Sequence, residues 1–452
     1  MAQGHAMGQK VPGLATPVGL NDRRRTLALE ALAAYWSVSI APVAALPIPV
    51  TLPPAEEPLP PRLAEVRLPP WAADLAPDGV IPVPGHCVRE GAGDDHLRVD
   101  WLSAAYWYLN GSAERAFEAA HGPIHSYAYK LAGWPVRMWE RAWANRIALF
   151  LRRWAAREAG ATEDALLGPL PEAEIFVTHD VDAVRKTWSI RVKQPVFHGF
   201  NGLRRLLAGD PKGAAAKFAT ALRFAFSGAD YWKFDEMEEM ERGARVSAVY
   251  LLYGRAPDER RGVLRLVDPA YDVLEAPVAE RLRALVARGH AVGVHPSYAT
   301  WEDSAAMRRE RERVERATGA RAVHCRQHWL RFSWTRTWAA QHAAGLEIDF
   351  TLGFNDRPGF RNGAALRFRP WDASGTSLGI ESVPLVLMDS QLYDYADMDD
   401  TCRETAIGHW LGEVSAVRGC ASVIWHPHTL APDYGWRGGF AMLLRALPGA
   451  RP

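Results

Sequence analysis

The feature that most constrains the fold is a series of short apolar runs that alternate with amphipathic helical segments beyond about residue 170. The runs predicted as strands are 175–179, 246–253, 291–295, 321–325, 348–352, 380–386 and 421–426. A helix is predicted at 277–288, before Gly289, and another at 303–318, with Asp303 as its N-cap and Gly319 after its last turn. Seven β-then-α units are typical of a parallel sheet that closes, or nearly closes, into a barrel.

Three of these runs end abruptly in acids or histidines, within the segments 175–182, 291–298 and 422–428. Parallel strands place their carboxyl ends on one rim, where α/β enzymes carry their chemistry. The side chains expected on this rim are Asp180, Asp182, His295, Arg326, His328, Asp349 and His426. Carboxylate and imidazole groups from separate strands are what a catalytic metal site requires.

Composition excludes several classes of protein. The 452 residues carry 53 basic and 52 acidic side chains, and the only single-sign block is 23–25, so nothing indicates nucleic acid or an anionic membrane as a partner. The four cysteines form no CxxC pair, which argues against a disulfide framework. The segment 26–50 resembles a signal peptide, but Glu30 and the following prolines interrupt it. No run approaches the ~18 apolar residues of a membrane span. We expect a soluble, cytoplasmic protein of undetermined oligomeric state.

The chain divides into three parts by pattern. Residues 1–70 are predicted to be a flexible tail and a proline-rich linker, because the start is glycine-rich and 42–70 is dense in proline. Residues 71–168 show helical spacing and are predicted to be a mostly helical module of unknown role. Residues 169–452 form the barrel.

The segment Thr178-His179-Asp180-Val181-Asp182 resembles the first motif of the polysaccharide deacetylases, the NodB-homology carbohydrate esterases, and the resemblance covers about 170–445. It implies a distorted seven-stranded (β/α) barrel. It also implies that Asp180 is the catalytic base and Asp182 a metal ligand.

The second motif of that family has two metal-binding histidines four residues apart. His295 matches the first, but Ala299 stands where the second would be. One Asp and one His are too few for zinc, which prefers three protein ligands and a water. His328, in the segment 325–331 after the next strand, is the better candidate for the third ligand, and the hydroxyls of Ser297 and Tyr298 are weaker alternatives.

The remaining motifs fit in part. Arg326 corresponds to the arginine that holds the catalytic carboxylate ionised, and His426 to the histidine that protonates the leaving group, with His428 as a rival for that role. Asp349 is a weak counterpart of the fourth motif. The acidic run 389–400 lacks the spacing of a calcium loop and is predicted to precede a helix at 401–418.

The resemblance implies a hydrolase that uses a divalent metal, zinc or else cobalt, nickel or iron, to remove an N-acetyl group from an amino sugar in a glycan or glycoconjugate. A hydrolase of another amide, or a degenerate carbohydrate-binding module, are the alternatives. Substrate contacts are predicted for Trp329, Arg331, Trp425 and His428. Trp334 and Trp371 are further candidates at the rim.

Overall fold

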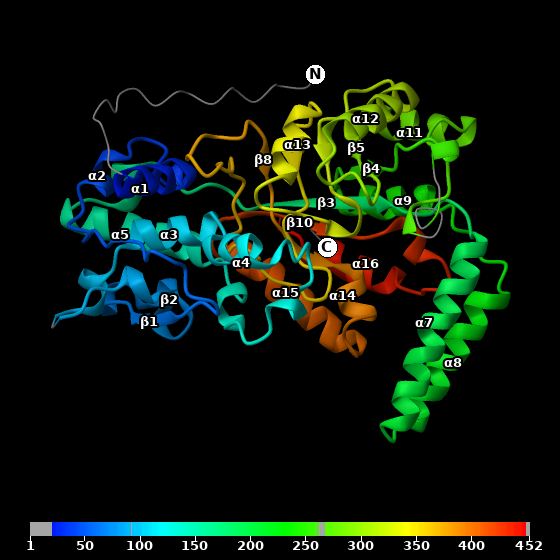
Figure 1. Ribbon diagram of the computed structural model, residues 1–452, viewed down its shortest axis with the longest axis horizontal. Helices are drawn as coiled ribbons and strands as arrows, with labels where there is room; N and C mark the ends of the chain where they lie inside the picture. The colour runs from blue at the N-terminus through cyan, green and yellow to red at the C-terminus, as the bar shows by residue number, and fades with distance from the viewer. Residues whose placement is uncertain (1–19, 92, 260–261, 263–266, 449–452) are drawn as a thin grey trace.

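The computed structural model describes residues 20–91, 93–259, 262 and 267–448. Residues 1–19, the first part of the predicted tail, lie outside the described residues. A barrel domain occupies the centre, an N-terminal region packs against one side of it, and a helical hairpin projects from the opposite side (Figure 1).

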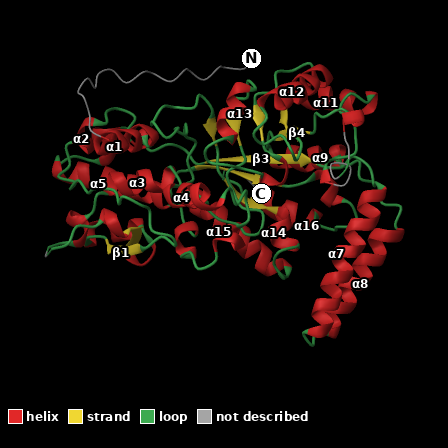
Figure 2. Ribbon diagram, viewed as in Figure 1, coloured by secondary structure: helices red, strands yellow, loops and turns green. Residues whose placement is uncertain are grey.

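The barrel is built from parallel strands. In spatial order they are β8 (Glu381–Ser382), β7 (Ile348–Asp349), β6 (His324–Cys325), β5 (Ala291–Val294), β4 (Val249–Leu252), β3 (Glu174–Val181), β10 (Cys420–Ile424) and β9 (Leu385–Met388). Strands such as β4 and β9 are buried along their whole length, and this explains why they read as continuous apolar runs instead of alternating ones. The strands lie at the centre with helices around them (Figure 2).

The predicted count of seven barrel strands is wrong, since the barrel sheet has eight strands in the part of the chain that the structure describes. The predicted strand 380–386 is divided into β8 and β9, and these lie at opposite ends of the strand order. Val383 and Pro384, the two residues between β8 and β9, form hydrogen bonds with strands on the two sides of the gap. The Val383 amide donates to the Asp349 carbonyl of β7 at 2.8 Å, and the Ser422 amide of β10 donates to the Pro384 carbonyl at 2.7 Å. Pro384 has no amide hydrogen, so the ladder is interrupted there. This segment therefore brings the two edges of the curled sheet together.

Helices surround the sheet. Those of the barrel are α9 (Phe234–Ala244), α11 (Ala276–Ala287), α12 (Ser304–Thr318), α13 (Thr337–Ala343), α14 (Asp389–Tyr393), α15 (Asp400–Ala416) and α16 (Arg437–Ala446). The three predicted helices lie within two residues of α11, α12 and α15. Asp303 accepts a hydrogen bond from the Ala306 amide at 2.9 Å, and Gly319 ends α12 with a φ of 71°. Two long helices were not predicted: α7 (Trp188–Leu207) and α8 (Pro211–Phe226), which form the projecting hairpin.

The N-terminal region is more ordered than its proline content predicts. Its elements are α1 (Leu20–Ala31), α2 (Ala41–Ala44), β1 (Leu63–Arg67), β2 (Val80–Pro84), α3 (Trp101–Leu109), α4 (Ser112–His121), α5 (Trp143–Glu158) and α6 (Glu163–Leu167), joined by short 3₁₀ turns. The described part of the predicted tail and linker, 20–70, buries Leu32, Tyr35 and Val43 completely. It is therefore packed chain and not a free linker, because its apolar residues find partners in α3 and α5.

Buried ion pairs join this region to the barrel. Glu413 of α15 accepts two hydrogen bonds from Arg146 of α5, at 2.8 and 2.6 Å, and its side chain is 1% exposed. Arg361 pairs with Glu114 of α4. None of the helices in the described part of the chain is both long and apolar enough to cross a membrane.

Candidate metal centre

Three side chains from different loops converge at the carboxyl rim of the barrel. Asp182 follows β3, His295 follows β5, and His328 begins a short turn after β6, and their nearest ligand atoms all lie within 4.8 Å of one another. Asp182 Oδ1 is 3.5 Å from His295 Nε2 and 3.6 Å from His328 Nδ1, while the two ring nitrogens are 2.8 Å apart. The structure thus brings together the three side chains that the sequence suggested as ligands.

The hydrogen bonds on the far side of each ring fix which nitrogen faces the cluster. His295 Nδ1 donates to the Arg326 carbonyl at 2.7 Å, and His328 Nε2 donates to the Val267 carbonyl at 2.8 Å. Since a carbonyl can only accept, His295 Nε2 and His328 Nδ1 are the nitrogens that face the cluster. Two imidazole nitrogens this close need a positive charge between or beside them, either a shared proton or a metal ion. Burial lowers the pKa of His295, but Asp180 and Asp182 outweigh this and raise it, so the cluster favours a cation.

The carboxylate supports the same conclusion. Asp182 Oδ1 is buried and has no hydrogen-bond partner among the described residues. Burial raises the pKa of Asp182, but the neighbouring imidazoles outweigh burial and hold this pKa well below its usual range, so the group is anionic. An anionic oxygen and two imidazole nitrogens, each with an outer hydrogen bond that orients it, fit a divalent metal with an open position.

Asp180 lies beside this cluster and is held by an arginine. Arg326 is fully buried and donates to Asp180 Oδ1 at 2.8 Å, to Thr178 Oγ1 at 2.7 Å and to the Phe350 carbonyl at 3.0 Å. Burial raises the pKa of Asp180, but the guanidinium outweighs it and keeps that pKa below the usual value. The second oxygen of Asp180 is 4.0 Å from His295 Nε2 and so faces the cluster.

His426, after β10, lies on the other side of Asp182, with 3.6 Å between its Nε2 and Asp182 Oδ2. Its Nδ1 donates to Asp389 Oδ1 at 2.8 Å, and its backbone amide donates to Asp389 Oδ2 at 2.8 Å. Burial lowers the pKa of His426, but the Asp389 carboxylate outweighs this and raises it to about 10. His426 is therefore a cation near neutral pH.

Asp389 is a site residue that the sequence analysis missed, because the acidic run it begins was interpreted as a loop. The signal was present: the apolar run of β9 ends at Asp389 just as β3 ends in acids. The pKa of His428, the other candidate for the proton donor, is shifted in the direction opposite to that of His426. Burial lowers the pKa of His428 to about 4, so this ring is neutral.

The segment around position 299 explains the missing second histidine. Glu310 of α12 accepts hydrogen bonds from the Ser297 amide at 2.8 Å and the Ser297 hydroxyl at 2.5 Å, and Asp268 accepts one from the Tyr298 amide at 2.9 Å. With the loop held this way, Ala299 is exposed to solvent. Ser297 is engaged with Glu310 and does not supply a ligand to the cluster.

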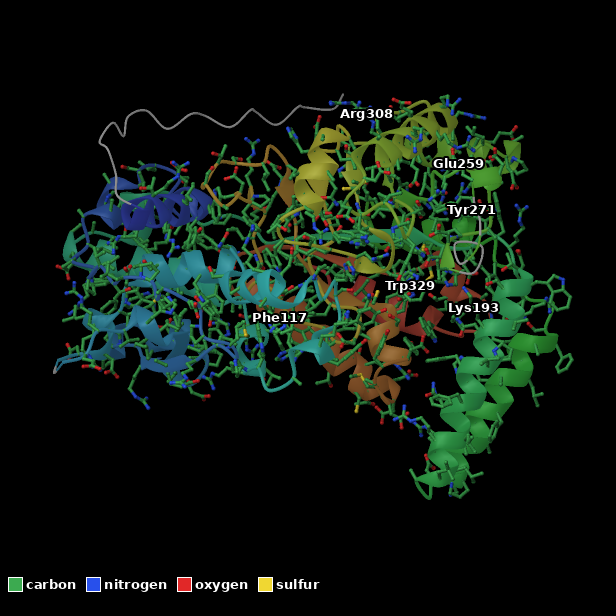
Figure 3. The ribbon with its side chains drawn as sticks, viewed as in Figure 1. Phe117, Lys193, Glu259, Tyr271, Arg308 and Trp329 are labelled. Atoms are coloured by element: carbon green, nitrogen blue, oxygen red, sulfur yellow. The ribbon has the colours of Figure 1, made fainter. Side chains whose placement is uncertain are left out.

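A cavity of about 230 Å³ opens beside the cluster. Asp182, His328, Trp329 and His428 line it together with Lys193 and Tyr271 (Figure 3 labels Lys193, Tyr271 and Trp329). Trp329 is 44% exposed, and its backbone has a φ of 57°, a strained value for a bulky residue. Trp329 and His428, two of the predicted substrate contacts, are thus placed at the cavity.

The other predicted substrate contacts lie elsewhere. Trp425 is fully buried against Phe440 beneath the site, so the prediction that it touches substrate is wrong. Trp334 and Trp371 are also buried, against the N-terminal region. Arg331 does not line the cavity: its guanidinium lies over the Tyr298 ring at 4.2 Å.

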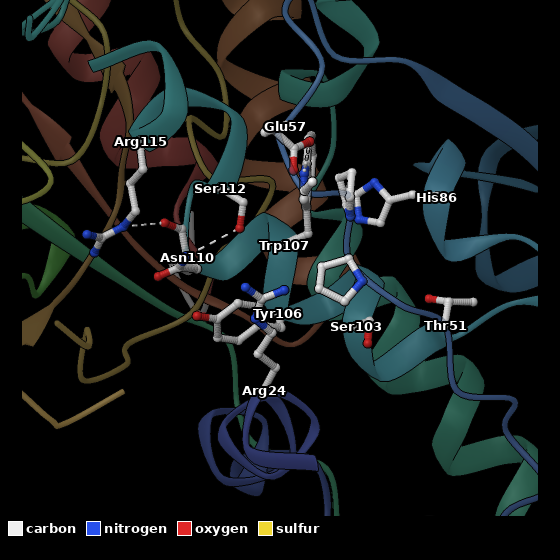
Figure 4. Close-up of a pocket in the computed structure, with 13 residues that line it drawn as sticks. Arg24, Thr51, Glu57, His86, Ser103, Tyr106, Trp107, Asn110, Ser112 and Arg115 are labelled. Carbon is white, nitrogen blue, oxygen red and sulfur yellow. Dashed lines mark hydrogen bonds between the residues drawn. The ribbon is translucent and has the colours of Figure 1, made fainter. Parts of the chain in front are cut away.

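Other polar side chains near the rim have structural roles. Asp349 is buried and accepts hydrogen bonds from Trp338 at 2.9 Å and Gln341 at 2.8 Å, so it ties α13 to the sheet. His179 points to the opposite side of β3, where it pairs with Glu241. A second cavity, of about 270 Å³, lies in the N-terminal region between α1, α3 and the 51–57 segment (Figure 4). Its lining includes Arg24, Tyr106 and Trp107, and it is separate from the histidine cluster.

Fold and site together define an α/β-barrel protein with an Asp-His-His cluster at its carboxyl rim. No protein-family model and no curated protein matches the chain. Among solved structures, it is similar to a candidate polysaccharide deacetylase from Mycobacterium smegmatis, with 18% identity, a TM-score of 0.34, and coverage of 62% of this chain and 84% of that one. It is also similar to a CE4 family pseudoenzyme from Bacillus anthracis, with 13% identity, a TM-score of 0.24, and coverage of 60% of each chain. A mutant CE4 pseudoenzyme with restored enzymatic activity gives the same identity and TM-score.

Proposed function

We propose that this protein is a metal-dependent hydrolase that removes an acetyl group from an amino sugar of a glycan or glycoconjugate and releases acetate. The observation that carries the proposal is the geometry around Asp182, His295 and His328. A carboxylate paired with an arginine stands on one side of this cluster, and a protonated imidazole stands on the other.

Asp182, His295 and His328 are the residues that would hold the metal, with zinc as the first expectation for this donor set. A divalent metal in that position polarises an amide carbonyl and lowers the pKa of a water molecule toward ~7. The outer hydrogen bonds to the Arg326 and Val267 carbonyls keep both rings turned toward it.

Asp180 acts as the general base in this proposal. Its ionised form is stabilised by Arg326, and its free oxygen faces the cluster, so it can accept the proton of the attacking water. The C–O bond to the carbonyl carbon forms as that proton moves to Asp180. His426 then donates its proton to the departing nitrogen as the C–N bond breaks, and the products are acetate and a free amine.

Two histidines compete for the role of general acid, and the electrostatics favour one of them. His426 is protonated at neutral pH because Asp389 accepts from it, whereas buried His428 is neutral and has no proton to spare as an acid. We therefore assign the proton donor to His426 and a contact with the substrate to His428 and Trp329.

Metal content and acetate release together test the proposal. Wild type is expected to hold about one equivalent of metal per chain and to release acetate from N-acetylated sugars. His328→Ala should lose the metal, while His409→Ala, which removes an exposed histidine from α15, should keep it. Asp180→Asn should keep the metal and lose turnover.

Other outcomes would redirect the assignment. Full metal occupancy in His328→Ala would remove His328 from the ligand set. Metal without acetate release, but with turnover of small amides, would leave the metal chemistry and exclude the sugar substrate. No metal in wild type after reconstitution would contradict the proposal as a whole.

A further inference from the structure

The projecting hairpin of α7 and α8 buries the side on which its two helices meet, and it touches the barrel through Gln194 with Tyr434 and through Arg205 with Asp397. His198 of α7 stacks on Phe224 of α8, with 5.3 Å between ring centroids, and a side chain added at Gly202 would touch Phe218. α7 has 20 residues, which makes it about 30 Å long. Most of its remaining surface faces solvent, away from the barrel (Figure 1).

This free surface carries an apolar stripe, which we call the hairpin stripe. On α7 it repeats at intervals of three or four residues, the spacing of one helix face. Its members there are Trp188, Val192, Val196, Phe200, Leu203 and Leu207, all between 49% and 80% exposed. On α8 two further apolar side chains, Leu222 and Phe226, lie four residues apart and are 61% and 81% exposed. Exposed apolar groups of this size on one element mark an interaction surface.

The charged side chains of the hairpin are nearly all basic. Between residues 188 and 226, the span of the two helices, the chain has seven Lys or Arg residues and a single acid, Asp210, although the whole chain is balanced at 53 to 52. Of the seven, Arg205 forms salt bridges with Asp210 and Asp397. Lys193 and Arg204 are exposed and follow directly after the stripe residues Val192 and Leu203. The balance of the whole chain hides this local excess, and for that reason composition alone indicated no anionic partner.

We propose that the hairpin docks on an anionic membrane surface, with the hairpin stripe in the headgroup region and the basic side chains on lipid phosphates. Helices with Trp, Phe and Leu on one face and Lys and Arg beside it lie in the plane of the interface in this way. A second copy of the chain is a poorer occupant, because two hairpins placed face to face would bring their excess positive charges together. A nucleic acid would leave the stripe without a partner.

The hairpin also forms one wall of the site. Ser189, Ile190 and Lys193, in the first two turns of α7, line the same cavity as Asp182 and His328. Docking would therefore hold the mouth of that cavity close to the headgroups, where a lipid-linked glycan is presented. The docking itself depends on the hairpin alone, so its test measures binding and not turnover.

The experiment is co-sedimentation of the full chain with phosphatidylcholine vesicles and with equimolar phosphatidylcholine–phosphatidylglycerol vesicles. Wild type is expected to bind the anionic vesicles and to release them as salt rises. The variant Val196→Ser/Phe200→Ser/Leu203→Ser should need at least about tenfold more lipid for half-binding. The matched control, Val38→Ser/Leu52→Ser/Tyr129→Ser, removes three apolar side chains of the N-terminal region that are at least as exposed, and it should bind as wild type does.

A second pair of variants tests the charges. Arg204→Glu/Lys212→Glu should weaken binding to anionic vesicles by about tenfold or more, whereas Arg309→Glu, on exposed α12 surface, should not. All replaced side chains are exposed, so thermal unfolding should be unchanged in every variant. Equal binding to both vesicle types, or full binding by the stripe variant, would overturn the proposal. The proposal would also be overturned if light scattering showed that wild type is a dimer and that the stripe variant is a monomer.

Discussion

Replacing Arg326 with Met should destabilise the protein strongly. Both Arg326 and Asp180 are buried, at 0% and 3% exposure, and the guanidinium is the charged partner of that carboxylate. Without it Asp180 is a buried anion that has lost its hydrogen-bonded counter-charge, a loss that typically costs about 3–5 kcal/mol. The hydrogen bonds to Thr178 and Phe350 are lost as well, and each unsatisfied buried group adds to the cost.

The assay is urea unfolding followed by tryptophan fluorescence, with Asp180→Asn and the double variant measured beside Arg326→Met. If the ion pair is the cause, Asp180→Asn in the Arg326→Met background should recover part of the loss, with a coupling energy of about 1–3 kcal/mol. The free energy of unfolding of Arg326→Lys should lie between those of wild type and Arg326→Met, because lysine keeps the positive charge but lacks the planar guanidinium that makes several hydrogen bonds. A loss under about 1 kcal/mol for Arg326→Met, or strictly additive effects in the double variant, would refute the reasoning.

Three further outcomes are expected. Glu413→Ala should lower the free energy of unfolding by about 3 kcal/mol in urea unfolding, because it leaves Arg146 buried and unpaired where the N-terminal region meets the barrel. Burial lowers the pKa of His198 to about 4 in the folded state, below the usual value of about 6.5, so the unfolded chain binds more protons as pH falls. The contribution of His198 to stability should therefore be constant above about pH 6.5 and should fall by about 3 kcal/mol between there and about pH 4. Urea unfolding of wild type and His198→Gln over this pH range should show that share as the difference between the two curves, while other buried histidines such as His428 keep their own contributions in both. Ser126, in the N-terminal region, donates a hydrogen bond to the Trp329 carbonyl at 3.1 Å and so helps to position Trp329 at the cavity. Ser126→Ala should therefore raise the KM of the proposed substrate more than it lowers kcat.

The strands and the rim were predictable because the burial of a strand determines which residue types it can contain. A strand covered on both faces must be apolar along its length, and a polar residue that follows marks the point where the chain reaches solvent. Asp180, His295 and His426 were found at the rim for this reason. The same rule would have found Asp389 if the strand before it had been extended to Met388, but Pro384 interrupts that segment.

The hairpin could not be predicted by the same reasoning. Pro195 lies inside α7, where a proline normally argues against a helix. The apolar residues of α7 face solvent and not the core, so the rule that the apolar face is the buried face does not apply. The packing of residues 20–70 was missed for a related reason, since proline-rich chain can be ordered by partners that are distant in sequence, as Tyr35 is by the Val417 carbonyl.

The backbone determines which loops contribute side chains to the Asp-His-His cluster. Glu310 and Asp268 hold Ser297 and Tyr298, and the next position, Ala299, is exposed to solvent. His328 reaches the cluster from the following loop, where positive φ values at Trp329 and Leu330, 57° and 47°, turn the chain sharply after it. That strained turn keeps the His328 ring against His295 and leaves Trp329 at the mouth of the cavity. The same backbone feature thus places His328 in the cluster and shapes the entrance, so changes in this turn should affect the proposed metal binding and the proposed substrate contacts together.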